Sequence, residues 1–189
     1  MCRVILIITV FVCVVSPALG AEWIVRDANI MGTTIHVEVW HEDTALAEKA
    51  ANMVLQTMEE VNQGMSPYID SSELSRVNYL ASSEVLAISA ELYSVIDQSL
   101  VYSARTNGAF DITFASVGYL YNYRESIRPD QALLDEQLSG VNFRHIELNE
   151  ADRTIHFRHK GVRIDLGGIA KGYAVDLSVE RAQTLGIEH

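Results

Sequence analysis

The sequence predicts an α+β fold in which an antiparallel sheet packs with helices, and two observations carry that prediction. From Thr34 to Trp40 apolar and polar residues alternate, which is typical of a strand with one buried face. Later in the chain, short polar turns separate three apolar segments that we expect to form an antiparallel meander, over 144–148, 154–158 and 162–166. Strands in antiparallel connection that are combined with helices make an α+β domain.

Helical spacing of apolar residues predicts the remaining elements. The first helix begins at Asp43 or Thr44, either of which can cap it, and ends at Gly64. A short helical turn is expected after Ser72. Three more helices are expected over 89–105, between Pro129-Asp130 and Gly140, and over 169–185. Each of these three stops at a glycine, the residue that most readily adopts the left-handed conformation at a helix end.

The charge balance excludes two classes of partner. The chain has 189 residues, of which 25 are acidic and 14 basic, so its formal net charge is −11 at pH 7. A protein of this charge lacks the basic stripe that binds nucleic acid, and it has no general attraction to an anionic membrane surface. An anionic substrate must therefore be held by local devices, namely a divalent metal, backbone N–H groups or a helix N-terminus.

Residues 1–20 have the pattern of an export signal, which leaves 21–189 as the mature domain. Arg3 precedes an apolar run from Val4 to Val15, and small residues stand at the cleavage positions before Ala21. The run is too short to span a membrane. Both cysteines lie inside the signal, and Cys13 stands in the middle of the apolar run, which argues against a lipid anchor. We therefore expect a soluble periplasmic protein without disulfides.

The richest motif runs from Val162 to Asp176. The strand expected there ends at Asp165, two glycines at 167 and 168 make a turn, and a helix follows whose first N–H groups can bind an anion. Lys171 lies in the first turn of that helix and can direct a positive charge toward a phosphate. The spacing is neither that of a Walker loop nor G-x-G-x-x-G. From the residues alone, a plain turn between strand and helix is the commoner explanation.

Three shorter segments could also approach a ligand. Small residues between Thr106 and Thr113 precede Phe110 and Asp111 and could pass close to a flat ring, although the pattern alone favours a helix stop with Phe110 buried. Gly32, at the start of the first strand, could admit a ligand against the backbone. Tyr68 offers a stacking surface, although a single loop tyrosine is usually structural.

Four motifs follow one another along the chain: Met31-Gly32-Thr33, then Met65-Ser66-Pro67-Tyr68 with 72–78, then Gly108-Ala109-Phe110-Asp111 with Thr113, and last the segment 165–176. In this order they resemble the ApbE family, the FAD:protein FMN transferases. The resemblance implies an ApbE-like fold of the T-fold-like kind. It covers nearly all of the mature chain but only the first half of a family domain. Ile187-Glu188-His189 looks like the opening of another strand, so we expect the chain to be truncated relative to a complete domain.

The resemblance also implies an activity. Family members bind FAD with Mg²⁺ and transfer FMN to a Thr or Ser hydroxyl of a partner protein, and AMP is released. Their partners are typically flavin-carrying subunits of membrane redox complexes. Some members instead hydrolyse FAD to FMN and AMP as pyrophosphatases. A flavin-binding protein without catalysis is the third alternative.

Site residues follow from the resemblance, position by position. The FAD contacts it implies are Met31, Tyr68, Ala109, Phe110, Asp111, Lys171 and Leu177, and Ala174 would offer its main-chain carbonyl to Mg²⁺. The family's other metal ligands, an Asp and a Thr, and its further catalytic groups belong to the second half of the family domain. Ile112 stands where family members often have Pro. The sequence thus supplies half of an active site and leaves the catalytic residues unknown.

Overall fold

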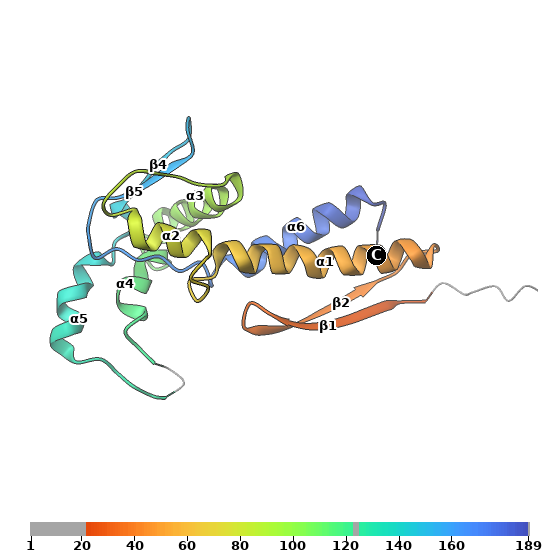
Figure 1. Cartoon of the computed structure of the whole chain (residues 1–189), viewed down its shortest axis with the longest axis horizontal. Helices are drawn as coiled ribbons and strands as arrows, with labels where there is room; N and C mark the ends of the chain where they lie inside the picture. Colours follow the sequence, from red (N-terminus) through yellow and green to blue (C-terminus); the bar gives the residue numbers. More distant parts are fainter. Residues whose placement is uncertain (1–21, 123–124, 189) are drawn as a thin grey trace, which may run out of the picture.

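The computed structural model describes residues 22–122 and 125–188, and it confirms the α+β class. The export signal expected over 1–20 and both cysteines lie outside these residues. Figure 1 shows the long helix α1 (Thr44–Met65) with the hairpin of β1 (Ile24–Ile30) and β2 (Thr33–Val39) along one side and α6 (Ala170–Thr184) close by. The other elements gather around the C-terminal end of α1. No helix in the described part of the chain has the length and apolarity to cross a membrane.

The hairpin joins β1 (Ile24–Ile30) and β2 (Thr33–Val39) through a two-residue turn at Met31 and Gly32. Both turn residues have positive φ, +55° and +71°, as a type I′ turn requires. Gly32 thus lies in the turn directly before β2, and its positive φ gives a conformational reason for the glycine. That it admits a ligand against the backbone stays a prediction. The alternation in β2 is confirmed, and Val37 and Val39 are buried.

The helix α1 begins where predicted because the Asp43 carboxylate accepts hydrogen bonds from the N–H groups of Ala45 and Leu46. Three buried alanines, Ala47, Ala50 and Ala51, let the helix approach the hairpin closely. Packing of α6 against α1 is reinforced by Arg181, whose guanidinium donates to Thr57 Oγ1 at 2.9 Å and to Glu60 at 2.7 Å. These contacts fix α6 alongside α1.

A second sheet has three antiparallel strands in the order β3–β5–β4, formed by Leu86–Ala87, Thr154–Phe157 and Ile146–Asn149. Two strands of the expected meander are thus confirmed. The third, over 162–166, was wrong, because the backbone of this extended segment bonds to side chains. Asn78 Oδ1 accepts from the Ile164 N–H at 2.8 Å, and Asn78 Nδ2 donates to the Ile164 carbonyl at 2.9 Å. The short β3 takes the third place in the sheet.

The helices α2, α3 and α5 lie at the predicted positions, whereas the short helix α4 was not predicted. The expected turn after Ser72 is a full helix, α2 (Glu73–Leu80), because the Ser72 hydroxyl caps it by accepting from the Ser75 N–H at 2.9 Å. Ser89 caps α3 in the same way. The bounds of the others are α3 Ala90–Arg105, α4 Ala115–Gly118 and α5 Gln131–Gln137, with single 3₁₀ turns at Ile112–Phe114, Leu138–Gly140 and Phe143–His145.

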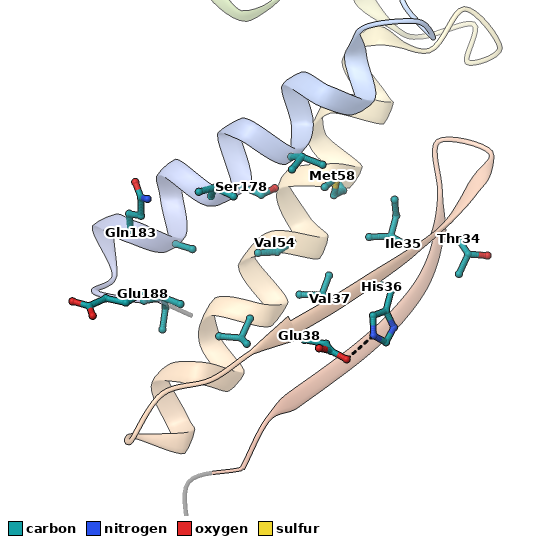
Figure 2. Close-up of a pocket in the computed structure, with 15 residues that line it drawn as sticks. Thr34, Ile35, His36, Val37, Glu38, Val54, Met58, Ser178, Gln183 and Glu188 are labelled. Carbon is teal, nitrogen blue, oxygen red and sulfur yellow. Dashed lines mark hydrogen bonds and ion pairs between the residues drawn. The ribbon is translucent and has the colours of Figure 1, made fainter.

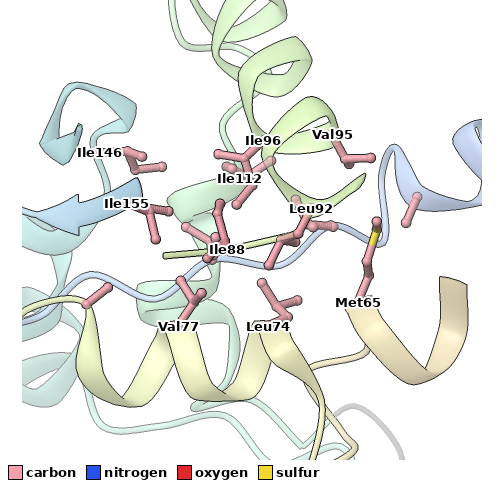
Figure 3. Packing of buried hydrophobic residues seen from close by; sticks show 14 of the residues in the cluster. Met65, Leu74, Val77, Ile88, Leu92, Val95, Ile96, Ile112, Ile146 and Ile155 are labelled. Atoms are coloured by element: carbon pink, nitrogen blue, oxygen red, sulfur yellow. The ribbon is translucent and has the colours of Figure 1, made fainter. Parts of the chain in front are cut away.

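The main apolar core lies where α2, α3 and the second sheet meet. Figure 3 shows Leu74 of α2, Ile96 of α3 and Ile155 of β5 pointing into one cluster. Ile164 and Leu166 are fully buried in the same cluster. Because these two residues flank Asp165, the core holds the segment that leads into α6 in a fixed position.

Candidate functional site

The loop after α3 presents a partly buried aromatic ring. Asn107 and Gly108 both have positive φ and end the helix, as predicted. The chain then turns back, and the Phe110 N–H donates to Thr106 Oγ1 at 3.0 Å. The Phe110 ring meets the ring of Tyr102 edge-on, with centroids 6.3 Å apart. Phe110 is therefore not the fully buried residue that the pattern alone favoured, because only part of its ring packs on the core.

Asp111 organises this loop with its carboxylate. Its Oδ1 accepts from the Thr113 N–H at 2.8 Å and from the Thr113 hydroxyl at 2.6 Å. Its Oδ2 accepts from the Phe143 N–H at 2.9 Å. These three hydrogen bonds hold the carboxylate in one orientation. Ala109, two residues earlier in the loop, is exposed at the surface.

The segment from Asp165 to Lys171 forms a tight turn at the start of α6. Asp165 Oδ1 accepts from the Gly167 N–H at 2.6 Å. The helix begins at Ile169 without a side-chain cap and has no acidic residue in its first turn, so the positive end of its dipole is not neutralised by its own side chains. Lys171 Nζ donates to the Gly167 carbonyl at 2.8 Å and is exposed. A cation and a helix N-terminus thus lie together at this turn.

These two loops lie against each other, and we call the pair, residues 108–113 and 165–171, the motif junction. The Asp165 N–H donates to the Ile112 carbonyl at 3.0 Å. A Cβ added at Gly168 would lie 3.3 Å from the Phe110 ring, a distance tighter than ordinary van der Waals contact. Gly168 has no positive φ, so the close approach to Phe110 explains this glycine better than backbone strain does.

Two more residues with implied roles share a core cluster with Phe110. Met31, at the hairpin turn, and Leu177, on α6, are both partly buried and pack against that cluster. Tyr173 lies between the junction and Leu177 along α6, and burial raises the pKa of its phenol above the ordinary value of 10.0. The phenol is therefore neutral at physiological pH and can donate a hydrogen bond.

Tyr68 is placed differently from the other implied contacts. It lies in the loop between α1 and α2, and its side chain is 89% exposed. Its N–H donates to Ser66 Oγ at 3.3 Å, so the backbone is ordered by a local turn while the ring lies free of the core. The structure therefore packs Met31, Phe110 and Leu177 against one core cluster, places Phe110 against the turn at Gly168, and leaves the Tyr68 ring at the surface.

The described residues do not form a metal site by themselves. No group of three or more His, Cys, Asp or Glu side chains within 22–122 and 125–188 could hold a metal ion. Ala174, the implied Mg²⁺ ligand, is fully buried on α6, and its carbonyl accepts from the Ser178 hydroxyl at 2.7 Å. One carbonyl is far short of the six oxygen ligands of Mg²⁺, so a metal here needs ligands beyond these residues.

From the sequence, Asn78 was only one of the polar residues that indicated a helical turn after Ser72, although it belongs to the second motif. Its amide bridges α2 to the backbone of Ile164, the residue directly before the second segment of the motif junction. It thus positions the junction without lying in it. A polar residue that follows the buried Leu74 and Val77 on a short helix is the signal that could have indicated this inward bond.

Known proteins match this chain over the region that contains these motifs. A family model described as the ApbE family matches residues 31–189. The chain is 31% identical over 176 residues to the FAD:protein FMN transferase of Vibrio cholerae, which covers 89% of this chain and 52% of that protein. It is 30% identical over 168 residues to the FAD:protein FMN transferase of Haemophilus influenzae, with 84% and 49% covered. The chain spans about half the length of the curated relatives it matches.

Solved structures give the same result for the fold. The flavin transferase ApbE from Vibrio cholerae superposes with a TM-score of 0.80 at 29% identity, over 89% of this chain and 56% of that one. The ApbE protein from Thermotoga maritima superposes with a TM-score of 0.79 at 24% identity, over 87% and 53%. The second likeness supports the fold alone.

Proposed function

The chain belongs to the ApbE family, and on that premise we propose that it serves in flavin transfer. In this reaction the hydroxyl oxygen of a Thr or Ser side chain of an acceptor protein attacks the phosphorus of the FMN half of FAD. A P–O bond of the pyrophosphate breaks, AMP leaves with the bonding electrons, and the hydroxyl proton is released. The observation that carries the proposal is the motif junction, because it joins a partly exposed aromatic ring, an uncapped helix N-terminus and a lysine.

Each part of the junction suits one part of FAD. The N-terminus of α6 and the Lys171 ammonium favour the pyrophosphate. The exposed part of the Phe110 ring and the side chains of Met31 and Leu177 offer apolar surface to a flat ring system. Asp111 keeps the Phe110 loop in place through its three hydrogen bonds, so in this proposal it acts by orientation as well as by contact.

Magnesium, the acceptor and the location belong to the same proposal. The acidity of the chain supports a need for Mg²⁺, since an anionic pyrophosphate must be neutralised, and the ion would be held partly by ligands beyond the described residues. We propose an acceptor that is a subunit of a membrane redox complex, and export of the chain to the periplasm. The pattern of residues 1–20 supports the export.

A single incubation tests the activity. The chain, joined to the second half of the Vibrio cholerae relative so that the family domain is complete, is mixed with FAD, Mg²⁺ and a purified acceptor protein. The acceptor is then examined for flavin fluorescence after denaturing electrophoresis, with AMP measured in parallel. We expect covalent flavin on the acceptor and one AMP per flavin, and neither with an acceptor whose Thr or Ser is replaced by Ala. Free FMN and AMP without labelled acceptor would instead indicate an FAD pyrophosphatase. Bound FAD with no AMP would indicate a flavin-binding protein.

A further inference from the structure

Two cavities of similar volume differ in the chemistry of their walls. A groove of about 460 Å³ between β2, α1 and α6 has mainly apolar walls, and Figure 2 shows Val37, Val54 and Met58 around it. A second cavity, of about 430 Å³, lies between α2, the ends of α4 and α5, and the segment 160–163. Most of its lining side chains are polar, and none belongs to the motif junction. We call it the cationic pocket, because its two basic lining residues are Lys160 and Arg163.

The backbone that forms the floor of the cationic pocket is held in place by the fold. The Arg163 N–H donates to the hydroxyl of Ser116, which is fully buried, at 3.0 Å. A Cβ added at Gly140 would lie 2.5 Å from the Gly161 carbonyl oxygen, so these two backbone segments leave no room for a side chain between them. The chain around Lys160 and Arg163 is therefore ordered before a ligand arrives, which lowers the entropic cost of binding.

The two cations of the pocket have no acidic partner. Lys160 and Arg163 form no ion pair with any residue in the described part of the chain. The Arg163 guanidinium lies over the Tyr119 ring instead, 4.5 Å from the ring centroid, and its N–H donors stay free of a carboxylate. Of the described residues that line the pocket, Asp70 alone is acidic. The pocket therefore attracts an anion, although the chain as a whole has a net charge of −11.

Exposed tyrosines form the mouth of the pocket. Tyr79 is 83% exposed and Tyr119 is 51% exposed, and Pro67 lines the same cavity. Tyr and Arg are enriched where proteins bind other proteins, because each combines a large rigid contact area with hydrogen-bonding groups. An open mouth of this composition suits a segment of polypeptide better than a small anion, which needs a more enclosed site.

The cationic pocket adjoins the motif junction. Val162, Ile164 and Leu166 are buried, whereas Arg163 and Asp165 between them are more exposed. Residues two positions apart in an extended segment face the same side and lie roughly 7 Å apart, so Arg163 of the pocket and Asp165 of the junction share one face. A protein that reaches the junction can therefore contact the pocket at the same time.

We propose that the cationic pocket binds an acidic segment of a partner protein, which, on the proposed function, is the flavin acceptor. Arg163 and Lys160 pair with carboxylates of that segment, and Tyr79 and Tyr119 contact its apolar parts. Asp70 repels the segment and limits its affinity. Anchoring the acceptor beside the junction raises the effective concentration of its hydroxyl there. The identity of the partner rests on the proposed function, whereas the preference for an acidic segment rests on the pocket alone.

Peptide binding tests the pocket without FAD or transfer. A fluorescein-labelled peptide rich in Asp and Glu, and a neutral counterpart in which Asn and Gln replace them, are titrated with the chain by fluorescence anisotropy. We expect only the acidic peptide to bind. Arg163→Gln and Lys160→Gln should each weaken its binding roughly fivefold, as loss of an exposed ion pair does. Asp70→Asn should strengthen binding, because a repelling carboxylate is removed. Arg153→Gln is the matched control, since Arg153 is exposed in the turn between β4 and β5 and lies outside the pocket.

The completed family domain of the transfer assay tests which protein is the partner. Arg163→Gln should raise the KM for the acceptor protein roughly fivefold and leave kcat and the KM for FAD unchanged. The reason is that FAD binds at the motif junction and the acceptor segment binds in the pocket. Arg153→Gln should change none of the three constants. Circular dichroism checks that all variants are folded, which we expect because the replaced side chains are exposed.

The outcomes separate this inference from the proposed function. Acidic-peptide binding that depends on Arg163 supports the pocket even where the completed domain transfers no flavin, a result that refutes the proposed function alone. Equal binding of acidic and neutral peptides, or equal peptide binding by Arg163→Gln, overturns the inference. Inorganic phosphate that displaces the peptide more effectively than unlabelled peptide does also overturns it, because the pocket is then a small-anion site. An unchanged KM for the acceptor, or a raised KM for FAD, overturns the assignment of the partner.

Discussion

Replacement of Asn78 by Ala should destabilise the chain more than any other single polar substitution discussed above. The Asn78 amide makes two hydrogen bonds, of 2.8 and 2.9 Å, with the N–H and carbonyl of Ile164, a residue 86 positions away. Ile164 is fully buried, so water cannot replace the lost partners easily. These two side-chain hydrogen bonds replace the backbone hydrogen bonds that Ile164 would have made as part of a third strand of the meander.

The magnitude follows from those two bonds. An unpaired buried donor or acceptor costs about 1–3 kcal/mol, so two of them give about 2–5 kcal/mol after partial relaxation. For a chain of this length, that lowers the melting temperature by roughly 4–20 °C. Because Ile164 precedes the turn at Gly167, we also expect weaker FAD binding by Asn78→Ala.

Urea unfolding followed by circular dichroism measures the effect. Asn78→Asp keeps the acceptor toward the Ile164 N–H but loses the donor, so its loss should be intermediate. Asn62→Ala is the matched control, because Asn62 Nδ2 reaches only Glu59, three residues away and at 3.4 Å. It should cost less than about 0.5 kcal/mol. A loss below that value for Asn78→Ala would refute the reasoning, since the Ile164 groups would then have other partners.

Three further predictions concern the junction and the hairpin. Gly168→Val should lower FAD affinity at least tenfold in a fluorescence titration with little change in melting temperature. The control Gly172→Ala, where an added Cβ meets nothing within 4 Å, should leave FAD affinity unchanged. Equal FAD affinities of the two variants would contradict the close approach of Gly168 to Phe110. Lys171→Ala should weaken FAD binding by about 1–3 kcal/mol, roughly 5- to 150-fold, as one charge-assisted contact is lost. Hydrogen bonds to the carboxylates of Glu38 and then Asp27 raise the pKa of His36 above 6.5, so its stabilising contribution is full below pH 6.5 and is lost as pH rises through the folded pKa. Urea unfolding between pH 5 and 9 should therefore show that the unfolding free energy falls more steeply with pH for the unaltered chain than for His36→Gln. Parallel curves of unfolding free energy against pH would exclude a contribution from His36.

Helices were predictable because their signals are local. Asp43, Ser72 and Ser89 each stand at an N-cap and accept hydrogen bonds from N–H groups within three residues. The start of each helix is therefore determined by residues that are close together in the sequence. The same holds for the stop at Asn107 and Gly108. The length of α2 was underestimated, and the short helix α4 and the 3₁₀ turns at Ile112–Phe114 and Phe143–His145 were not predicted.

Sheet pairing could not be predicted as well, because its determinants are distant. The alternation of Val162, Ile164 and Leu166 is that of a strand, but the partner of Ile164 is a side chain on α2. The strand β1 was missed because Arg26 interrupts its alternation and Met31-Gly32 lacks the usual Asn-Gly turn signal. The two-residue β3 is too short to carry any pattern.

For the candidate site, the sequence predicted the pieces but not their distances. The segments around Phe110 and Gly168 were singled out, and the structure brings them within van der Waals reach. It also places Met31 and Leu177 on the same core cluster as Phe110. The exposure of Tyr68 and the burial of Ala174 depend on tertiary packing and were not foreseeable from local pattern. Their roles remain predictions.

The hairpin turn has a consequence for anyone who would engineer this protein. Met31 adopts φ +55°, a conformation in which Asn or Gly is more stable than a residue with an unbranched apolar side chain. Selection for thermostability alone would therefore favour Asn at this position. Despite that conformational disadvantage, the methionine packs its thioether against the same core cluster as Phe110. Stabilising the turn and preserving the apolar surface that we propose binds flavin are opposing aims at residue 31. A library screened only for heat resistance would erode that surface without any visible loss of fold.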